Sequence, residues 1–229
     1  VIAPDLFGFG RSDKPVNDDD YSIDFHRNSL IKLIEKLDLK NITLVCQDWG
    51  GILGLSLPMD MQDRFSQLLV MNTGIPTGSS PSPGFDAWKG FATIATEIPV
   101  GGLVASDALE AVNLFDILAY DAPFPDEASK AGARAFPALV PIEDGMPGVE
   151  ENKRAWPALA AFDRPFLTLF GEDDPITRGS EKFLIERIAG AKDLPHATLP
   201  TCGHFSQEDQ PQTLAQGVID MARKAGLLA

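Results

Sequence analysis

The sequence is poor in several features that would point to particular kinds of protein. It has only two cysteines, Cys46 and Cys202, so it offers no disulfide framework and favours a reducing, cytoplasmic location. Basic residues number 19 against 33 acidic ones, and the net charge of −14 repels phosphate backbones and anionic lipid. No apolar run approaches the roughly 18–20 residues that span a bilayer. We therefore expect neither nucleic acid nor a membrane as a partner, and an acidic, monomeric protein.

The first residues resemble the end of a strand more than the start of a chain. Residue 1 is valine rather than an initiator methionine, and Val1–Asp5 has the sequence of a strand already under way. We therefore expect a fragment from which the first strands of a sheet are missing. A targeting segment ahead of Val1 would be invisible, so its absence carries no weight.

Hydrophobic periodicity alternates between strand-like and helix-like along the chain, which predicts an α/β fold with a mostly parallel sheet flanked by helices. The first apolar run suits a strand buried on both faces. The predicted strands are Ile42–Cys46, Leu68–Met71, Phe166–Phe170 and His196–Leu199. The predicted helices begin near Ser22, Ile52, Ser180 and Pro211.

A change of composition interrupts this alternation after the second strand. Six of the eleven residues from Gly74 to Gly84 are glycine or proline, which marks an excursion out of the sheet. The residues that follow show helical segments broken by prolines and no clear strand. We therefore predict a helical cap at residues 76–156, inserted into a core made of residues 1–75 and 157–229.

Three of the predicted strands end in a reactive side chain. Asp48 follows the first strand in Gln47–Gly51, a run with the layout of a nucleophile elbow in which Asp48 stands where G-x-S-x-G hydrolases have serine. An acidic turn at 172–174 follows the third strand, and His204 follows the fourth. Alone, each could be an ordinary helix-turn, loop or structural residue. Their order, nucleophile then acid then histidine, is the order of α/β-hydrolases.

On these residues the sequence resembles the haloalkane dehalogenases of the α/β-hydrolase superfamily, over essentially the whole chain. The segments that carry the resemblance are Asp5–Pro15, Gln47–Gly51, Gly84–Lys89, Ala122–Asp126 and Gly203–Phe205. The resemblance implies that Asp48 is the nucleophile, that His204 is the base, and that Asp174 is its acidic partner in preference to Asp173. It also implies a halide-binding pair, Trp49 and Trp88, and a substrate pocket lined by Phe85, Phe136, Pro137, Val140 and Ile176.

The resemblance further implies the reaction and part of the topology. A small haloalkane and water would give alcohol, halide and a proton through an aspartyl ester, without a metal or organic cofactor. The second oxyanion donor and the third strand would precede Val1, and that strand would lie between the residues at Val1 and the strand at Ile42. We therefore expect a gap or a displaced N-terminal segment there, and no regular pairing of Val1–Pro4 with Ile42–Cys46.

Two alternatives remain open. An epoxide hydrolase would use the same Asp-Trp elbow, but it needs lid tyrosines to protonate the leaving oxygen, and only Tyr120 of the two tyrosines falls in the predicted cap. A non-catalytic binding protein with the hydrolase fold would have a broken triad. An ordinary esterase is disfavoured because no serine occupies the elbow. Cys46 and Cys202 are interpreted as small buried packing residues.

Overall fold

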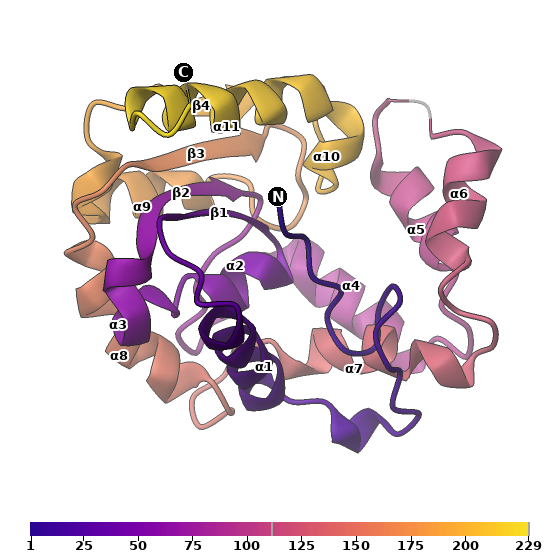
Figure 1. The fold of residues 1–229 in the computed structure, drawn as a ribbon. Coiled ribbons are helices and arrows are strands. Elements are labelled where there is room, and N and C mark those ends of the chain that lie inside the picture. Colours follow the sequence, from indigo (N-terminus) through magenta and orange to yellow (C-terminus); the bar gives the residue numbers. More distant parts are fainter. Residues whose placement is uncertain (111, 229) are drawn as a thin grey trace.

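Four parallel strands form the sheet and lie side by side in the order in which they occur along the chain (Figure 1). They are β1 (Ile42–Gln47), β2 (Phe65–Met71), β3 (Phe166–Gly171) and β4 (Ala197–Leu199). The computed structural model describes residues 1–110 and 112–228. All four predicted strands are confirmed, and the fold is that of an α/β protein with helices on its parallel sheet.

Helices cover both faces of the central strands. Leu69 and Met71 of β2 pack in a cluster with Leu214 and Met221, whereas Leu68 and Val70, which point the other way, pack in a second cluster. The first cluster is closed by α11 (Pro211–Lys224). The second is closed by α1 (Ile23–Lys36), α8 (Val149–Ala160) and α9 (Ser180–Arg187). Burial on both faces explains why the part of β2 from Leu68 to Met71 is an unbroken apolar run.

β1 differs from the expectation of a strand buried on both faces. It is the edge strand of the sheet, Val45 is 43 % exposed, and only Cys46 of the strand is fully buried. Among the described residues no strand pairs with its outer edge. Side chains at such an edge have neighbours on one side only, so part of an apolar strand stays in contact with water.

The N-terminal segment is extended chain rather than the end of a strand. Val1–Pro4 has no regular secondary structure and is exposed, so the expectation of a strand there is wrong. A single segment becomes a strand only when a neighbour satisfies its backbone N–H and C=O groups. The expected lack of pairing between Val1–Pro4 and the strand at Ile42 is confirmed, since β1 pairs only with β2 in the described part of the chain.

The region between β2 and β3 is helical. In it lie α4 (Pro83–Ile94), α5 (Val100–Asp107), α6 (Leu114–Asp121), α7 (Ala131–Leu139) and α8. The predicted boundary after residue 156 falls inside α8. Ala155 and Leu159 of this helix pack in the same cluster as Leu68 and Val70 of β2. Proline at position 157 removes one backbone donor without ending the helix. The division into core and cap therefore stays a prediction.

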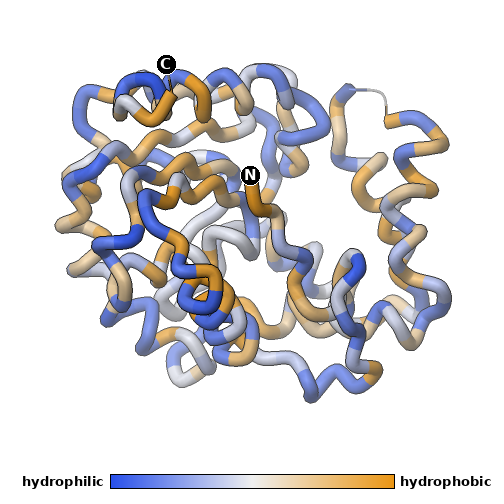
Figure 2. The backbone as a smooth tube through the Cα atoms, viewed as in Figure 1, coloured by the Kyte–Doolittle hydropathy of each residue, from blue (hydrophilic) through white to orange (hydrophobic). Residues whose placement is uncertain are grey.

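Helix α6 exposes apolar side chains to solvent. Leu114 is 65 % exposed, Phe115 81 % and Leu118 54 %, and Figure 2 shows apolar residues along α5 and α6 as well as along the strands. The two helices contact one another and lie at the outer side of the molecule, away from the sheet (Figure 1). Among the described helices, none combines the length and the apolar character that crossing a membrane requires.

His26 of α1 lies fully buried in an aromatic surrounding. Its ring centroid is 4.8 Å from that of Phe136, 5.2 Å from Phe25 and 5.9 Å from Tyr21. Neither ring nitrogen has a hydrogen-bond partner among the described residues. Burial without a partner disfavours the charged imidazolium and lowers the pKa of His26 from 6.5 to about 4.

We predict that His26 makes the protein less stable in acid. Between pH 6.5 and 4 the unfolded chain binds a proton at this histidine that the folded chain does not bind, so the free energy of unfolding falls as the pH falls. The loss amounts to at most about 3 kcal/mol. Replacement by leucine, His26→Leu, should remove this part of the slope in urea unfolding at a series of pH values. Parallel slopes for the two proteins would contradict the prediction.

Candidate active site

Asp48 lies in a sharp turn between β1 and α2 (Trp49–Gly54). Its backbone has φ 48° and ψ −121°, a conformation that non-glycine residues rarely adopt and that costs roughly 1–3 kcal/mol. Surrounding hydrogen bonds hold it there: the Asp48 N–H donates to the Asn72 carbonyl (3.1 Å), and the Asp48 carbonyl accepts from the Thr73 hydroxyl (2.6 Å). The turn lifts the carboxylate to the carboxyl edge of the sheet.

Gly51 makes this turn possible. A Cβ at position 51 would overlap the side chain of Thr73, which itself bonds the Asp48 carbonyl. The first turn of α2 therefore packs directly against the residues that follow β2. Trp49 is the first residue of α2, so its backbone N–H has no acceptor within the helix. This group is available as a hydrogen-bond donor at the carboxyl edge of the sheet.

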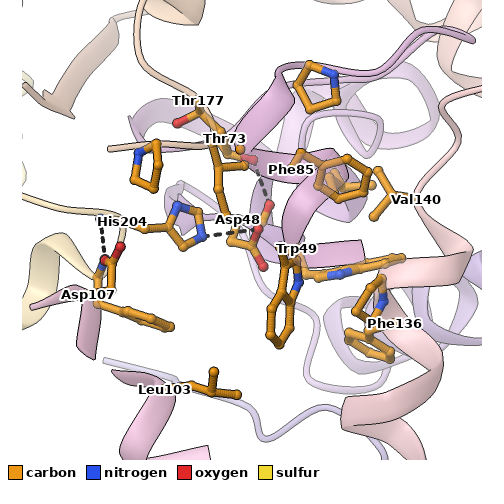
Figure 3. Close-up of a pocket in the computed structure, with 18 of the residues that line it drawn as sticks. Asp48, Trp49, Thr73, Phe85, Leu103, Asp107, Phe136, Val140, Thr177 and His204 are labelled. Atoms are coloured by element: carbon orange, nitrogen blue, oxygen red, sulfur yellow. Dashed lines mark hydrogen bonds and ion pairs between the residues drawn. The ribbon is translucent and has the colours of Figure 1, made fainter. Parts of the chain in front are cut away.

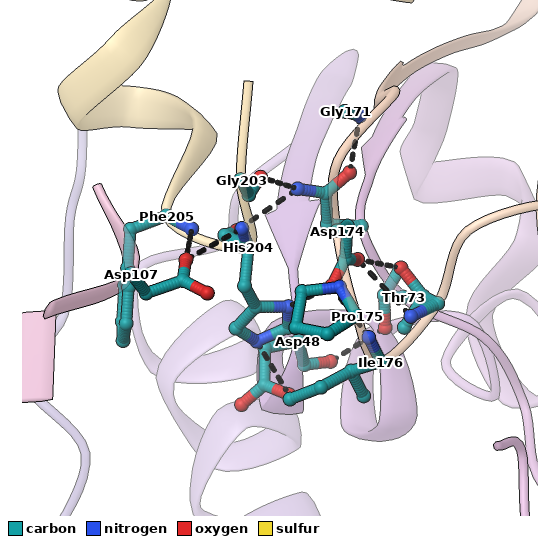
Figure 4. A network of polar contacts seen from close by, with 12 residues as sticks. Asp48, Thr73, Asp107, Gly171, Asp174, Pro175, Ile176, Gly203, His204 and Phe205 are labelled. Atoms are coloured by element: carbon teal, nitrogen blue, oxygen red, sulfur yellow. Dashed lines mark hydrogen bonds and ion pairs between the residues drawn. The ribbon is translucent and has the colours of Figure 1, made fainter. Parts of the chain in front are cut away.

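The imidazole of His204 lies between two carboxylates (Figure 4). Its Nε2 atom is 3.4 Å from Oδ1 of Asp48, and its Nδ1 atom is 3.1 Å from Oδ1 of Asp174. Asp174 is 1 % exposed, whereas its neighbour Asp173 faces solvent. The three side chains follow β1, β3 and β4, so the sheet brings together residues that are far apart in the sequence.

Asp174 is held as a carboxylate despite its burial. Oδ1 accepts from the Ile176 N–H (2.8 Å), and Oδ2 accepts from the Thr177 N–H (3.1 Å) and from the Thr177 hydroxyl. Burial acts to raise the pKa of Asp174, but the bond to His204, the charge of that ring and the bonds from Thr177 and Ile176 lower it overall. The turn thus supplies an ionised acceptor at Nδ1 of His204.

The same two carboxylates control the charge of His204. Burial alone lowers the pKa of the imidazole, but the hydrogen bonds and charges of Asp174 and Asp48 outweigh burial and raise the pKa from 6.5 to about 10. Both carboxylates therefore favour the protonated form of the ring, while burial opposes it. Loss of the charge on Asp48 would remove one of the two causes and lower the pKa again.

A cavity of about 500 Å³ opens in front of Asp48 and His204 (Figure 3). Its wall is mostly apolar, and the ring of Trp49, which is 8 % exposed, lies tilted against the ring of Phe136 with the two centroids 4.4 Å apart. Trp88 reaches the same cavity from α4. All the residues that the sequence suggested as pocket or halide-binding residues line it, namely Trp49, Trp88, Phe85, Phe136, Pro137, Val140 and Ile176.

Comparisons with known proteins show to which family the chain is similar. The model of the alpha/beta hydrolase family matches residues 1–216. A haloalkane dehalogenase of Psychrobacter cryohalolentis is 44 % identical over 94 % of this chain and 72 % of its own length, and one of Mycolicibacterium paratuberculosis is 41 % identical over 96 % and 73 %. The solved haloalkane dehalogenase DpaA from Paraglaciecola agarilytica NO2 superposes with a TM-score of 0.83 at 43 % identity, covering 94 % of this chain and 72 % of its own.

The chain belongs to the haloalkane dehalogenases of the alpha/beta hydrolase family. The resemblance stated from the sequence is therefore confirmed. The DpaA structure is described as tetrameric, which does not fit the monomer expected from the acidic charge. That expectation rested on net charge alone, and a net charge does not exclude a specific apolar or hydrogen-bonded contact.

Two residues of this dehalogenase site were missed by the sequence reasoning. Asn72, fully buried after β2, donates from Nδ2 to the carbonyls of Gly203 (2.8 Å) and His204 (2.9 Å) and accepts from the Gly171 N–H (2.7 Å). Gln47 places its amide nitrogen 3.2 Å from Nε2 of His204 and 3.1 Å from the His204 carbonyl. Gln47 ends β1 and Asn72 directly follows β2. These positions at the carboxyl ends of strands could have indicated from the sequence that both side chains lie near the triad.

Other candidate groups of this dehalogenase lie apart from the triad. Both cysteines are free and buried in different clusters, and burial raises the pKa of each thiol to about 12, which agrees with a packing role. Tyr120 lines the cavity, but its hydroxyl donates to the Glu208 carboxylate. No group of three potential ligands capable of holding a metal ion occurs within residues 1–110 and 112–228.

Proposed function

We propose that this chain cleaves the carbon–halogen bond of small haloalkanes with water, giving alcohol, halide and a proton. The observation that carries the proposal is a carboxylate, Asp48, 3.4 Å from the Nε2 atom of a buried histidine and facing an apolar cavity lined by two indoles. In this proposal residues 76–156 act as the cap over the core residues 1–75 and 157–229. The cavity of about 500 Å³ limits the substrate to small molecules.

In the first step, Asp48 acts as the nucleophile. Aspartate side chains are ionised at neutral pH, so an oxygen of Asp48 attacks the substrate carbon without losing a proton first. A carbon–oxygen bond forms, and the electron pair of the carbon–halogen bond leaves with the halide. A halide in an apolar cavity needs hydrogen-bond donors, and the indole N–H groups of Trp49 and Trp88 supply them.

In the second step, His204 acts as the general base. The ester on Asp48 carries no charge, so one of the two causes that favour the protonated ring is gone and the neutral ring acts as the base. Neutral Nε2 then accepts a proton from water, whose oxygen attacks the ester carbonyl, and Asp174 stabilises the imidazolium that forms. Collapse of the intermediate breaks the bond to the alkoxy oxygen, which takes the proton from the imidazolium and leaves as the alcohol, and the carboxyl group loses a proton to solvent to restore the Asp48 carboxylate.

The direct test supplies the protein with short bromoalkanes and measures bromide and alcohol. We expect equal amounts of both, far in excess of the enzyme. A parallel assay with terminal epoxides examines the alternative reaction, for which Tyr120 is the only cap tyrosine and is already bonded to Glu208. Diol formation without bromide release, or no reaction with either substrate class, would overturn the proposal.

We predict that Trp88→Phe slows turnover more than it weakens substrate binding. Phenylalanine keeps most of the apolar contact but removes the indole N–H, and a hydrogen bond to a charged group contributes about 1.5–3 kcal/mol, so kcat should fall roughly 10- to 100-fold. The matched control is Trp156→Phe, because Trp156 packs against Phe183 and does not line the cavity. Steady-state bromide release gives kcat and KM for both variants. Equal losses of kcat in Trp88→Phe and Trp156→Phe would contradict a halide-binding role of Trp88.

A further inference from the structure

Two carboxylates join the cap helices to the loop that carries His204. Asp107 is the last residue of α5, and its Oδ2 atom accepts from the backbone N–H of His204 (2.7 Å) and of Phe205 (3.2 Å), as Figure 4 shows. These bonds link residues that are about 97 positions apart. An ionised acceptor makes them stronger than bonds between neutral groups.

Asp209 makes the reciprocal connection. It lies at the end of α10 (Ser206–Asp209), is 7 % exposed, and accepts from the Leu109 N–H (2.8 Å) and the Glu110 N–H (2.9 Å) through Oδ1. Its Oδ2 atom accepts from the Gly203 N–H (2.7 Å). One carboxylate of the cap thus binds the histidine loop, and one carboxylate beside that loop binds both the loop and the cap.

The packing leaves little room for the histidine loop to move relative to α5. A Cβ at Gly203 would lie 2.6 Å from the carbonyl oxygen of Asp107, closer than real contacts allow. Glycine is therefore the residue that permits the Asp107 bonds to form. The contact fixes the backbone on either side of the His204 side chain, while Asp174 and Asp48 contact only its ring.

We propose that Asp107 is a positioning residue that holds His204 in place for hydrolysis of the aspartyl ester. Through this contact, the second step of the reaction depends on how the cap helix α5 packs against the histidine loop. This inference rests on the proposed function. Asp107 bonds the backbone of the base and not the nucleophile, so its loss should affect the step that uses the base. Attack of Asp48 on the substrate needs no base and should be affected little.

The test compares Asp107→Ala with the wild-type chain in rapid mixing with a short bromoalkane. The bromide burst should remain fast and equal to about one per enzyme, while steady turnover falls roughly 10- to 100-fold, as expected when a well-held base loses its alignment. Intact-mass measurement should then show the alkyl group accumulating on the protein. Asp107→Asn keeps an acceptor oxygen without the charge, so it should show the same change to a smaller extent.

Asp121→Ala is the matched control, because Asp121 accepts from the Gly101 N–H (2.9 Å) within the cap and does not contact the histidine loop. Asp121→Ala should lower the rate of the bromide burst and the rate of steady turnover to the same extent, or change neither. The inference is overturned if Asp107→Ala behaves like Asp121→Ala, or if no adduct accumulates. If Asp107→Ala does not fold, Asp107→Asn decides by the same readout. A wild-type chain that releases no bromide refutes the proposed function itself.

Discussion

Replacement of His204 by glutamine is expected to stop the reaction after one turnover. His204→Gln should release about one bromide per enzyme and then arrest, with steady turnover lowered roughly 10²- to 10⁴-fold, the usual contribution of a general base. Glutamine cannot accept a proton from water, but Asp48 attacks the substrate without help from a base. Rapid-mixing bromide detection measures the burst, and intact-mass measurement detects the ester that remains.

The control for His204→Gln is the same substitution at His196. That histidine opens the β4 segment, where Nδ1 lies 3.1 Å from the Thr168 nitrogen and Nε2 contacts the Ala191 carbonyl, away from the cavity. Per folded molecule, His196→Gln should turn over like the wild type. Sustained turnover by His204→Gln would exclude His204 as the base, and a missing burst would place it in the first step instead.

The helices and strands were predictable because their signals are local. Ser22, expected near the start of a helix, is the N-cap of α1 and accepts from the Phe25 N–H (3.1 Å). Apolar runs marked β2 and β3 because helices cover both of their faces. The exposure of β1 could not be predicted from its own residues, since it depends on which segments pair with its edge.

The candidate site was predictable where a side chain stands at the end of a strand. Asp48 and His204 are such residues, and the parallel sheet brings them to the same edge. The choice between Asp173 and Asp174 came only from the resemblance, because the two are adjacent and differ by the direction in which the turn points them. Asp107 gave no signal at all, because its bond to the His204 backbone depends on how α5, which is distant in the sequence, packs against the histidine loop.

The largest loss is expected from Asp48→Asn, which should abolish both the burst and the turnover. Asparagine adopts positive φ more readily than most residues, so it tolerates the φ of 48° at this position and the elbow keeps its shape. Its neutral amide oxygen is a far weaker nucleophile than a carboxylate, and bromide release should fall by roughly 10⁴-fold or more. The comparison with His204→Gln separates the two steps, because one variant forms the ester and cannot open it, while the other never forms it. A bromide burst from Asp48→Asn, with the amide still intact by mass, would mean that another group attacks the carbon, since the amide oxygen is too weak a nucleophile to sustain it.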